Sequence, residues 1–158
     1  MPQKNKLSLT VQYADPSLSG EVTRALLRRW TGAALLGPAE LTLRFVDAEE
    51  ARILNRDYRG KDYATNVLTF PYADASTPAD EPIRADIVFC SSVLRSEAAA
   101  QQKPLLAHAA HLVIHGVLHA QGYDHENDAD AAEMEALEVE ILCRLGLPDP
   151  YADTDAVL

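Results

Sequence analysis

The pattern of hydrophobic and polar residues along the chain predicts alternating strands and helices. Residues 7–13 alternate apolar and polar side chains, as a half-buried strand does, whereas apolar residues recur at helical spacing over 17–36. By the same criteria, further strands are expected at 40–46, 67–70 and 83–90, and further helices at 47–58, 91–102, 104–120 and 129–145. This order indicates a single α+β domain over residues 1–158, in which a small mixed β-sheet packs with helices.

The composition is that of a soluble globular protein, with 47% hydrophobic and 24% charged residues. No apolar run approaches the roughly 20 residues of a membrane-spanning helix, so no membrane partner is expected. The N-terminus has no apolar signal core, which argues against secretion. Cys90 and Cys143 lie far apart in apolar periodic segments and are predicted to be buried free thiols. Free thiols favour a reducing compartment, and we therefore expect the cytoplasm.

Charge is unevenly distributed along the chain. The formal net charge is −10, which taken alone argues against a nucleic-acid partner. However, residues 1–61 hold 10 of the 14 Lys and Arg and only 7 of the 24 Asp and Glu, so this part carries +3 and residues 62–158 carry −13. Because phosphate contacts are made by one face of a protein and not by its average charge, an RNA partner stays open.

Three histidines form the most informative pattern in the chain. His115 and His119 are four residues apart in the helix predicted at 104–120, so their imidazoles share one face with β-carbons about 5–6 Å apart. That separation suits two nitrogens that bind one ion at about 2.0–2.1 Å. Gly122 then permits a sharp turn, after which His125 can fold back over the same face as a third ligand. We therefore predict one metal ion per chain, with zinc favoured.

A site with three imidazoles leaves a fourth zinc position for water, which is typical of a catalytic centre and not of a structural one. Zinc lowers the pKa of its bound water toward about 7 and so supplies a nucleophile near neutral pH. Imidazoles also accept nickel, copper and iron, so the identity of the metal stays open. Because Gly116 follows His115, the pattern is not H-E-x-x-H with its glutamate base, which argues against the common metalloprotease form.

Four residues near these histidines are secondary candidates. His111 shares the helical face one turn before the first ligand, and we interpret it as a core residue or a support for the ligands. His108 is interpreted as a helix-surface residue. Asp124 and Glu126 flank the third ligand. Either could accept a hydrogen bond from an imidazole, and a solvated turn carboxylate is the equal alternative.

The sequence around the histidines resembles a known family. Residues 115–125, HGVLHAQGYDH, match the signature H-G-x-L-H-x-x-G-Y-D-H of the YbeY family of bacterial rRNA maturation endoribonucleases. Residues 54–72, LNRDYRGKDYATNVLTFPY, resemble the family segment L-N-x-x-Y-R-x-x-x-x-x-T-D-V-L-S-F-P, and shorter segments at 85–87 and 133–141 also agree. The resemblance covers about residues 40–150. The chain departs from the family pattern at Asn66 in place of Asp, Thr69 in place of Ser and Ala85 in place of Gly.

The resemblance implies a zincin-like α+β hydrolase fold, one zinc ion bound by His115, His119 and His125, and a metal-dependent endoribonuclease specific for single-stranded RNA. It further implies a role in 16S rRNA 3′-end maturation and ribosome quality control, with the 16S rRNA precursor as substrate. The expected partners are the small ribosomal subunit and its proteins, with an assembly GTPase as a further candidate. Arg59 is expected to contact RNA phosphate, so the expected catalytic residues are Arg59 and the three histidines. The missing carboxylate at Asn66 puts an acid/base role of that position in doubt.

Arg59 also has a chemical basis of its own. Arg52, Arg56 and Arg59 are spaced four and three residues apart, so they can share one helical face. A guanidinium offers a planar fork of donors that suits phosphate oxygens. The alternative interpretation is a solvated basic face whose charges pair with nearby carboxylates.

Several chemistries and functions stay open at this point. The favoured hypothesis is metal-assisted hydrolysis of RNA, in which Arg59 stabilises charge on the phosphate, and attack by the RNA 2′-hydroxyl is an alternative. A metallohydrolase of the protease or amidase type could use the same zinc-bound water. The chain could also be a zinc-bearing ribosome-assembly binding factor without intrinsic cleavage, whose metal holds the fold together.

Overall fold

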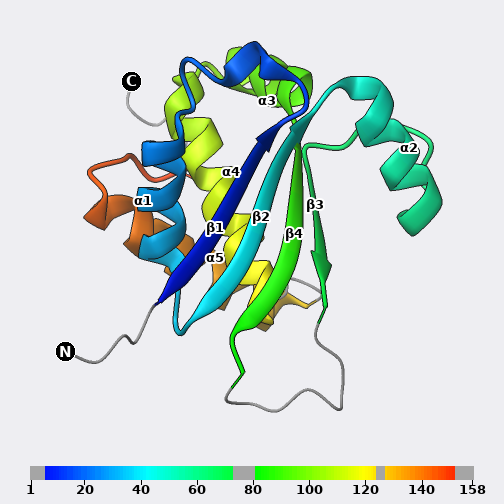
Figure 1. Ribbon diagram of the computed structural model, residues 1–158. Coiled ribbons are helices and arrows are strands. Elements are labelled where there is room, and N and C mark those ends of the chain that lie inside the picture. Colours follow the sequence, from blue (N-terminus) through cyan, green and yellow to red (C-terminus); the bar gives the residue numbers. More distant parts are fainter. Residues whose placement is uncertain (1–5, 73–80, 124–126, 152–158) are drawn as a thin grey trace.

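A four-stranded mixed sheet forms the centre of the computed structural model, which describes residues 6–72, 81–123 and 127–151 (Figure 1). Within these ranges the sheet has the order β1-β2-β4-β3. Its strands are β1 (Leu7–Tyr13), β2 (Ala39–Val46), β3 (Val67–Pro71) and β4 (Ile83–Cys90). Strands β1, β2 and β4 run parallel, and β3 pairs antiparallel with β4 at one edge. The small mixed sheet confirms the predicted α+β fold.

The helices of the described residues surround this sheet unevenly. They are the 3-10 helix η1 (Pro16–Leu18), α1 (Arg24–Ala34), α2 (Ala48–Arg59), α3 (Ser91–Ala100), α4 (Leu105–Ala120) and α5 (Asp128–Arg144). In Figure 1, α4 and α5 lie behind the sheet, α1 lies on the β1 side, and α2 stands on the β3 side. Helix α4 contacts α1, α3, α5, β3 and β4. The helix that carries the histidine pattern is therefore the central helix of the domain.

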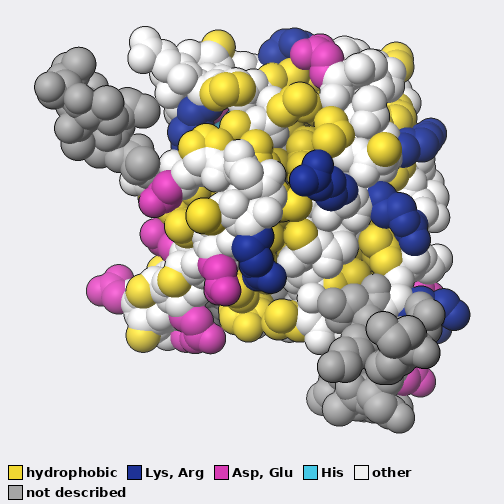
Figure 2. Space-filling view, turned by 90° about the vertical axis from the view of Figure 1, so that its left-hand side faces the viewer, with side chains coloured by type: hydrophobic (Ala, Val, Ile, Leu, Met, Phe, Trp, Pro, Cys, Tyr) yellow, Lys and Arg dark blue, Asp and Glu magenta, His cyan; other side chains and the backbone are white. Residues whose placement is uncertain are grey.

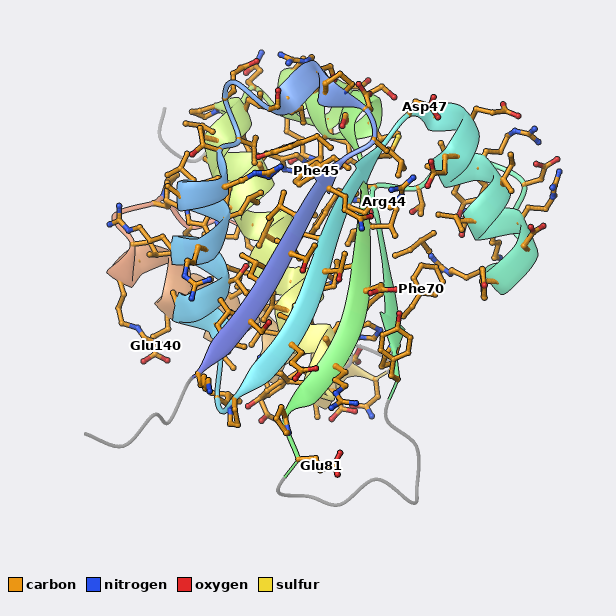
Figure 3. All side chains as sticks on the ribbon, viewed as in Figure 1. Arg44, Phe45, Asp47, Phe70, Glu81 and Glu140 are labelled. Atoms are coloured by element: carbon orange, nitrogen blue, oxygen red, sulfur yellow. The ribbon has the colours of Figure 1, made fainter. Side chains whose placement is uncertain are left out.

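Alternation along β2 gives the sheet one apolar face and one largely polar face. Leu41, Leu43 and Phe45 belong to the main core, which the sheet shares with α1, α4 and α5. Thr42 and Arg44 point to the opposite face, where Figure 3 shows Arg44 on the side of the sheet turned toward the viewer. This opposite face is only partly covered, so its polar residues remain accessible from outside.

Helix α2 packs on the end of that second face through a small separate core. Its members are Val46, Ala51, Leu68, Val88 and Cys90. The side chain of Asp47 caps the helix by accepting a hydrogen bond from the Glu50 N–H at 2.9 Å. Gly60 ends it with a φ of +70°, a left-handed conformation that glycine adopts at little cost. The buried Asn55 donates to the Tyr63 carbonyl at 2.8 Å and so fixes the turn that follows.

Gly116 allows α4 to lie close against the sheet. A β-carbon at this position would be 2.9 Å from Cγ2 of Ile87 and 3.5 Å from Cγ2 of Val67. Because Ile87 is fully buried, it has little room to move away. Close packing of α4 on the sheet therefore requires glycine at position 116. The glutamate of an H-E-x-x-H motif could not be accommodated here.

The first predicted helix, 17–36, is wrong in its extent. Residues Pro16–Leu18 form the separate turn η1, and α1 begins only at Arg24. Thr23 caps α1 by accepting a hydrogen bond from the Leu26 N–H at 3.3 Å, which sets a new helix start in the middle of the predicted segment. Val22 lies before this cap and is nevertheless fully buried. Its burial explains why the apolar pattern in the sequence extends beyond the N-terminus of α1.

The two cysteines differ in their surroundings. Cys90 is buried and Cys143 is exposed, and both are free thiols. The prediction that both are buried is therefore wrong for Cys143. Helix α5 buries Ile141 and Leu142, which face the core, and the next residue falls outside that apolar face. No helix in the described part of the chain is long and apolar enough to cross a membrane.

Charged side chains are also segregated in space. Figure 2 views the molecule from the left-hand side of Figure 1, the side on which α1 lies, and shows Lys and Arg side chains spread over the centre and right of this face. Asp and Glu side chains gather mainly at its lower left. Arg24, Arg28 and Arg29 of α1 are exposed, whereas α5 opens with the acidic residues Asp128 and Asp130. The net charge of −10 is therefore an average over unlike surfaces.

Candidate metal centre

Helix α4 places His115 and His119 side by side, as their spacing predicts. Their ring centroids are 6.5 Å apart and the ring planes differ by 12°. Both side chains line the same cleft. The third predicted ligand, His125, lies outside the described residues, as do Asp124 and Glu126. Within the described ranges, no group of three His, Cys, Asp or Glu side chains is placed to hold a metal ion.

The turn after α4 orients the second of these imidazoles. Gly122 has a φ of +103°, and its N–H donates to the carbonyl of His119 at 3.0 Å. The chain then folds back so that Nδ1 of His119 lies 2.9 Å from the carbonyl oxygen of Tyr123. Because a carbonyl only accepts, Nδ1 must carry the proton. A metal at His119 would consequently be bound through Nε2.

A buried carboxylate from α5 orients the first imidazole. Glu138 has no exposed surface, and its Oε2 accepts from Nδ1 of His115 at 2.7 Å. Its Oε1 accepts from Nε2 of His111 at 2.9 Å and from the hydroxyl of Tyr151. Burial raises the pKa of Glu138, but the hydrogen bonds from His111, His115 and Tyr151 outweigh burial and lower the pKa to about 2. Glu138 therefore accepts hydrogen bonds as a carboxylate at neutral pH.

The donor set suits zinc. Each of the two imidazoles has Nδ1 hydrogen-bonded to an oxygen, so Nε2 is the nitrogen through which either ring could bind a metal. A carboxylate or a backbone carbonyl behind a metal-binding histidine is the usual way in which proteins fix the ring and its tautomer. The described residues thus supply two oriented candidate ligands, and the third predicted ligand is His125.

The two remaining histidines of α4 belong to the interior. His111 is mostly buried and bonds to Glu138, which agrees with its interpretation as a support for the ligands. His108 is only 4% exposed, and its Nε2 lies 2.9 Å from Oε1 of Glu97, so the interpretation of His108 as a surface residue is wrong. The reason is that α1, α3, α5 and the sheet pack around α4 and leave it no broad solvent face.

A cleft of about 1000 Å³ connects the histidines to the polar face of the sheet and to α2. His115 and His119 contribute from α4, and Arg59 contributes from the last turn of α2. The lining between them comes from all four strands and from the residue that follows β3, and includes Gln12, Thr42, Arg44, Val67, Leu68, Thr69, Phe70, Tyr72, Asp86 and Val88. The structure therefore brings Arg59 into the same cleft as the two described histidines.

The arginines of α2 differ in their partners. Arg52 pairs with Asp62 at 2.6 Å and with Glu49 at 3.1 Å, and Arg56 pairs with Asp57 at 3.2 Å. These two fit the alternative interpretation of a solvated, paired basic face. Arg59 forms no ion pair with any of the described residues, and it is the only one of the three that lines the cleft. Its guanidinium is thus the one available to an anionic ligand.

Two exposed tyrosines flank the cleft. The sequence patterns did not single out either of them. Tyr58 and Tyr72 line it and are 69% and 62% exposed. The ring of Tyr58 packs edge-on against Phe70 with centroids 4.8 Å apart, and the hydroxyl of Tyr72 donates to Asp86. That hydrogen bond raises the pKa of Tyr72. The signal in the sequence that could have identified Tyr58 is its position directly before Arg59.

Asn66 belongs to a structural network and not to the cleft lining. Its Nδ2 donates to both carboxylate oxygens of Glu97, at 3.2 and 3.3 Å, and its Oδ1 accepts from the Val67 N–H at 2.7 Å. Glu97 also contacts His108. A carboxylate at position 66 would face Glu97 with a like charge, whereas the amide donates to it. The geometry therefore gives Asn66 a structural role.

The fold and the cleft together define the class of protein. It is a small α+β domain with a candidate metal centre on the central helix α4, beside the edge strand β3. The chain belongs to the YbeY family, because the family model described as Endoribonuclease YbeY matches residues 8–146. It is 64% identical over 154 residues to Endoribonuclease YbeY of Herminiimonas arsenicoxydans, with 96% of this chain and 99% of that protein covered. It is 62% identical over 151 residues to Endoribonuclease YbeY of Janthinobacterium sp. (strain Marseille), with 96% and 98% covered.

A solved structure shares the fold at low sequence identity. The solution structure of TM1509 from Thermotoga maritima matches with a TM-score of 0.52 and 21% identity, and the match covers 93% of this chain and 99% of that chain. This likeness concerns the fold alone.

Proposed function

We propose that this chain is a metal-dependent endoribonuclease that cleaves single-stranded RNA in the cleft between α2, β3 and α4. The observation that carries the proposal is the placement of His115 and His119 opposite an arginine, Arg59, without an acidic partner among the described residues. Membership of the family named Endoribonuclease YbeY supports the same activity. Imidazoles bind a cation and a guanidinium binds phosphate, so the cleft combines the two groups that phosphodiester cleavage requires.

We assign one zinc ion per chain to His115, His119 and His125. When bound, zinc supplies a Lewis acid for a phosphoryl oxygen and a water of lowered pKa. The chain itself orients the described ligands: Glu138 holds His115 and the Tyr123 carbonyl holds His119. Both imidazoles are thereby fixed before any metal or substrate arrives, which reduces the cost of ordering them.

Arg59 has the role of binding and stabilising the phosphate. It ends α2 and lines the cleft, and the neighbouring Arg52 and Arg56 are already paired with carboxylates. A guanidinium can donate two parallel hydrogen bonds to phosphate oxygens, and such bonds strengthen as negative charge develops in the transition state. The other arginine of the cleft, Arg44, is held by Glu50 at 2.8 and 3.1 Å.

The exposed tyrosines favour an unpaired RNA strand. Tyr58 and Tyr72 line the same cleft as Arg59, and both are largely exposed. Bases can stack on such rings only when they are not already stacked and paired within a duplex. Stacking is also tolerant of sequence, so these residues support selection of single strands without selection of a base.

The cellular assignment rests on the family and on the motifs quoted above. The proposed substrate is the 16S rRNA precursor, and the proposed roles are 3′-end maturation and ribosome quality control in the cytoplasm. The proposed partners are the small ribosomal subunit and its proteins, with an assembly GTPase as a further candidate. The basic residues of α1 on the face in Figure 2 are available for contacts with an RNA-bearing partner.

The test of the activity compares substrates and metal states of one preparation. We expect cleavage of a short single-stranded RNA, little cleavage of the same strand in a duplex, loss of cleavage on chelation and recovery with Zn²⁺. Cleavage of a strand with 2′-deoxy sugars would indicate hydrolysis, and resistance of that strand would indicate attack by the 2′-hydroxyl. Thermal unfolding of the same preparation should also be measured with and without chelator. If chelation melts the domain and the zinc-loaded protein never cleaves RNA, the ion is structural and the assembly-factor function applies.

A further inference from the structure

We propose that Glu138 is a positioning residue of the metal centre, which fixes the tautomer and ring orientation of His115. The inference rests on the proposed function, because it gives Glu138 a role toward the metal assigned there. It is carried by geometry. Oε2 of Glu138 lies 2.7 Å from Nδ1 of His115, and the carboxylate has no exposed surface.

The chemistry of a carboxylate determines where the imidazole proton sits. An ionised carboxylate only accepts hydrogen bonds, so the nitrogen of His115 that faces it must be Nδ1–H. A neutral imidazole with its proton on Nδ1 has its lone pair on Nε2. Glu138 therefore selects the tautomer that can bind a metal through Nε2. His119 reaches the same state through the carbonyl of Tyr123 at 2.9 Å.

The second carboxylate oxygen is held independently of the metal centre. Oε1 of Glu138 accepts from Nε2 of His111 at 2.9 Å and from the hydroxyl of Tyr151. These donors fix the carboxylate from the side away from His115. Oε2 thus lies at a defined position, and its hydrogen bond with Nδ1 sets the orientation of the His115 ring. Tyr151 is connected to His115 through Glu138, whereas His111 also packs edge-on against the ring of His115, with centroids 6.4 Å apart.

Packing alone does not explain a carboxylate at this position. Met134, Ile141 and Leu142 fill the same buried face of α5 with apolar side chains. An apolar side chain of similar volume at position 138 would complete that face, and buried ionic groups are often replaceable in this way without loss of stability. It would, however, leave Nδ1 of His115 and Nε2 of His111 without their acceptor. The specific consequence of the carboxylate is therefore that it determines which nitrogen of His115 carries the proton.

The experiment measures the tautomer and the zinc affinity of Glu138→Gln. In the metal-free wild type, imidazole ¹⁵N–¹H correlation spectra are expected to show His115 protonated at Nδ1. A glutamine can turn its NH₂ group toward His115, so the variant is expected to populate the Nε2–H form. Its affinity for Zn²⁺, measured by competition with a chelator, should fall about tenfold to hundredfold, the usual effect of losing the partner behind a metal-binding histidine.

The matched control is Glu140→Gln, which removes the same charge from the same helix. Figure 3 shows Glu140 projecting from α5 into solvent, and it is exposed. The control should keep the wild-type tautomer and the wild-type affinity. Unchanged zinc affinity together with Nδ1–H at His115 in Glu138→Gln would overturn the proposal, because a merely structural role alters stability without moving either readout.

Two further variants keep the result interpretable. If Glu138→Gln does not fold, Glu138→Asp retains the charge but withdraws the oxygen from His115, and wild-type zinc affinity in that variant would overturn the proposal. His119→Ala separates this inference from the proposed function. If His119→Ala binds Zn²⁺ as the wild type does, the proposed metal centre fails. If His119→Ala loses zinc while Glu138→Gln retains it in full, only the positioning role fails.

Discussion

The two walls of the cleft are built in different ways. On the α4 wall, His115 and His119 are bonded through Nδ1 to a buried carboxylate and to a backbone carbonyl. On the α2 wall, Arg59 is exposed at the end of a surface helix that rests on a small separate core. The interior of the domain thus fixes the groups proposed to bind the ion, whereas the group proposed to bind the substrate projects from the surface.

This difference separates the expected effects of mutation. Changes on the α4 wall should alter metal binding, and some should alter stability, because α4 is packed on several sides. Changes on the α2 wall should alter RNA cleavage and leave both metal binding and stability largely intact. The following predictions test that separation, beginning with the largest effect.

His119→Ala removes a proposed ligand and should have the largest effect on metal binding. Loss of an outer partner typically weakens metal binding about tenfold to hundredfold, so loss of a direct ligand should weaken it by more than about a hundredfold. Chelator competition with Zn²⁺ measures this change. The matched control is His108→Gln, which changes a buried histidine bonded to Glu97 and should keep the wild-type affinity. Equal losses in both variants would contradict the assignment.

Arg59→Ala should separate the two walls most clearly. Removal of one group that stabilises transition-state charge typically lowers the turnover rate about 10²–10³-fold, so we expect a loss of that size in RNA cleavage. Zinc affinity and thermal stability should stay at wild-type values. Arg52→Ala is the control on the same helix, since Arg52 is paired with Asp62 and does not line the cleft. A parallel loss of zinc affinity in Arg59→Ala would show that the walls are not independent.

Gly116→Ala tests the close packing of the α4 wall. Its new β-carbon would lie 2.9 Å from the buried Ile87, and such overpacking typically costs about 1–3 kcal/mol, partly offset by about 1 kcal/mol of helix preference. We expect urea denaturation to show a lower free energy of unfolding. Gly32→Ala in α1 is the matched control, because its β-carbon would meet no atom within 4 Å. That variant should be neutral or slightly more stable, and an equal change in both would refute the packing argument.

Asn66→Asp should have the smallest effect and a dependence on pH. The new carboxyl would face Glu97, so the pKa of the pair would rise in the folded state, and the variant should lose on the order of 1 kcal/mol near pH 7. The loss is present above the raised pKa and shrinks as the pH falls through it. Urea denaturation of both proteins near pH 7.5 and near pH 5 would check this. A difference that is equal at both pH values would contradict the like-charge explanation.

Local patterns predicted the parts of the molecule that depend on neighbours in sequence. The spacing of His115 and His119 was sufficient to place both on one face of α4, and Gly60 and Gly122 were sufficient to end two helices. The positions of the strands, though not their order in the sheet, followed from alternating or β-rich segments. In each case the determining contacts lie within one helix, one strand or one turn.

Contacts between distant elements could not be predicted in this way. Glu138 lies 23 residues after His115, and only the packing of α5 on α4 brings them together. A signal was nevertheless present, because Glu138 occupies a core position of α5 between Met134 and Ile141. A carboxylate on the apolar face of a helix is almost never buried without a partner. That rule predicts a partner, but it does not say which residue it is.

The two wrong burial predictions have opposite causes. His108 is buried because α4 is surrounded, and its nearly continuous apolar sequence is typical of a helix buried on all sides. Cys143 is exposed because α5 is covered on one side only. The number of covered faces is a tertiary property, and it decides both cases.

The central claim is that RNA cleavage occurs at the α4 wall. The most direct measurement is cleavage of a short single-stranded RNA by the zinc-loaded wild-type protein beside His119→Ala purified in the same way, since contaminating nucleases would appear in both preparations. We predict cleavage by the wild type and none by the variant. Equal cleavage in both, or none in either, would contradict the claim.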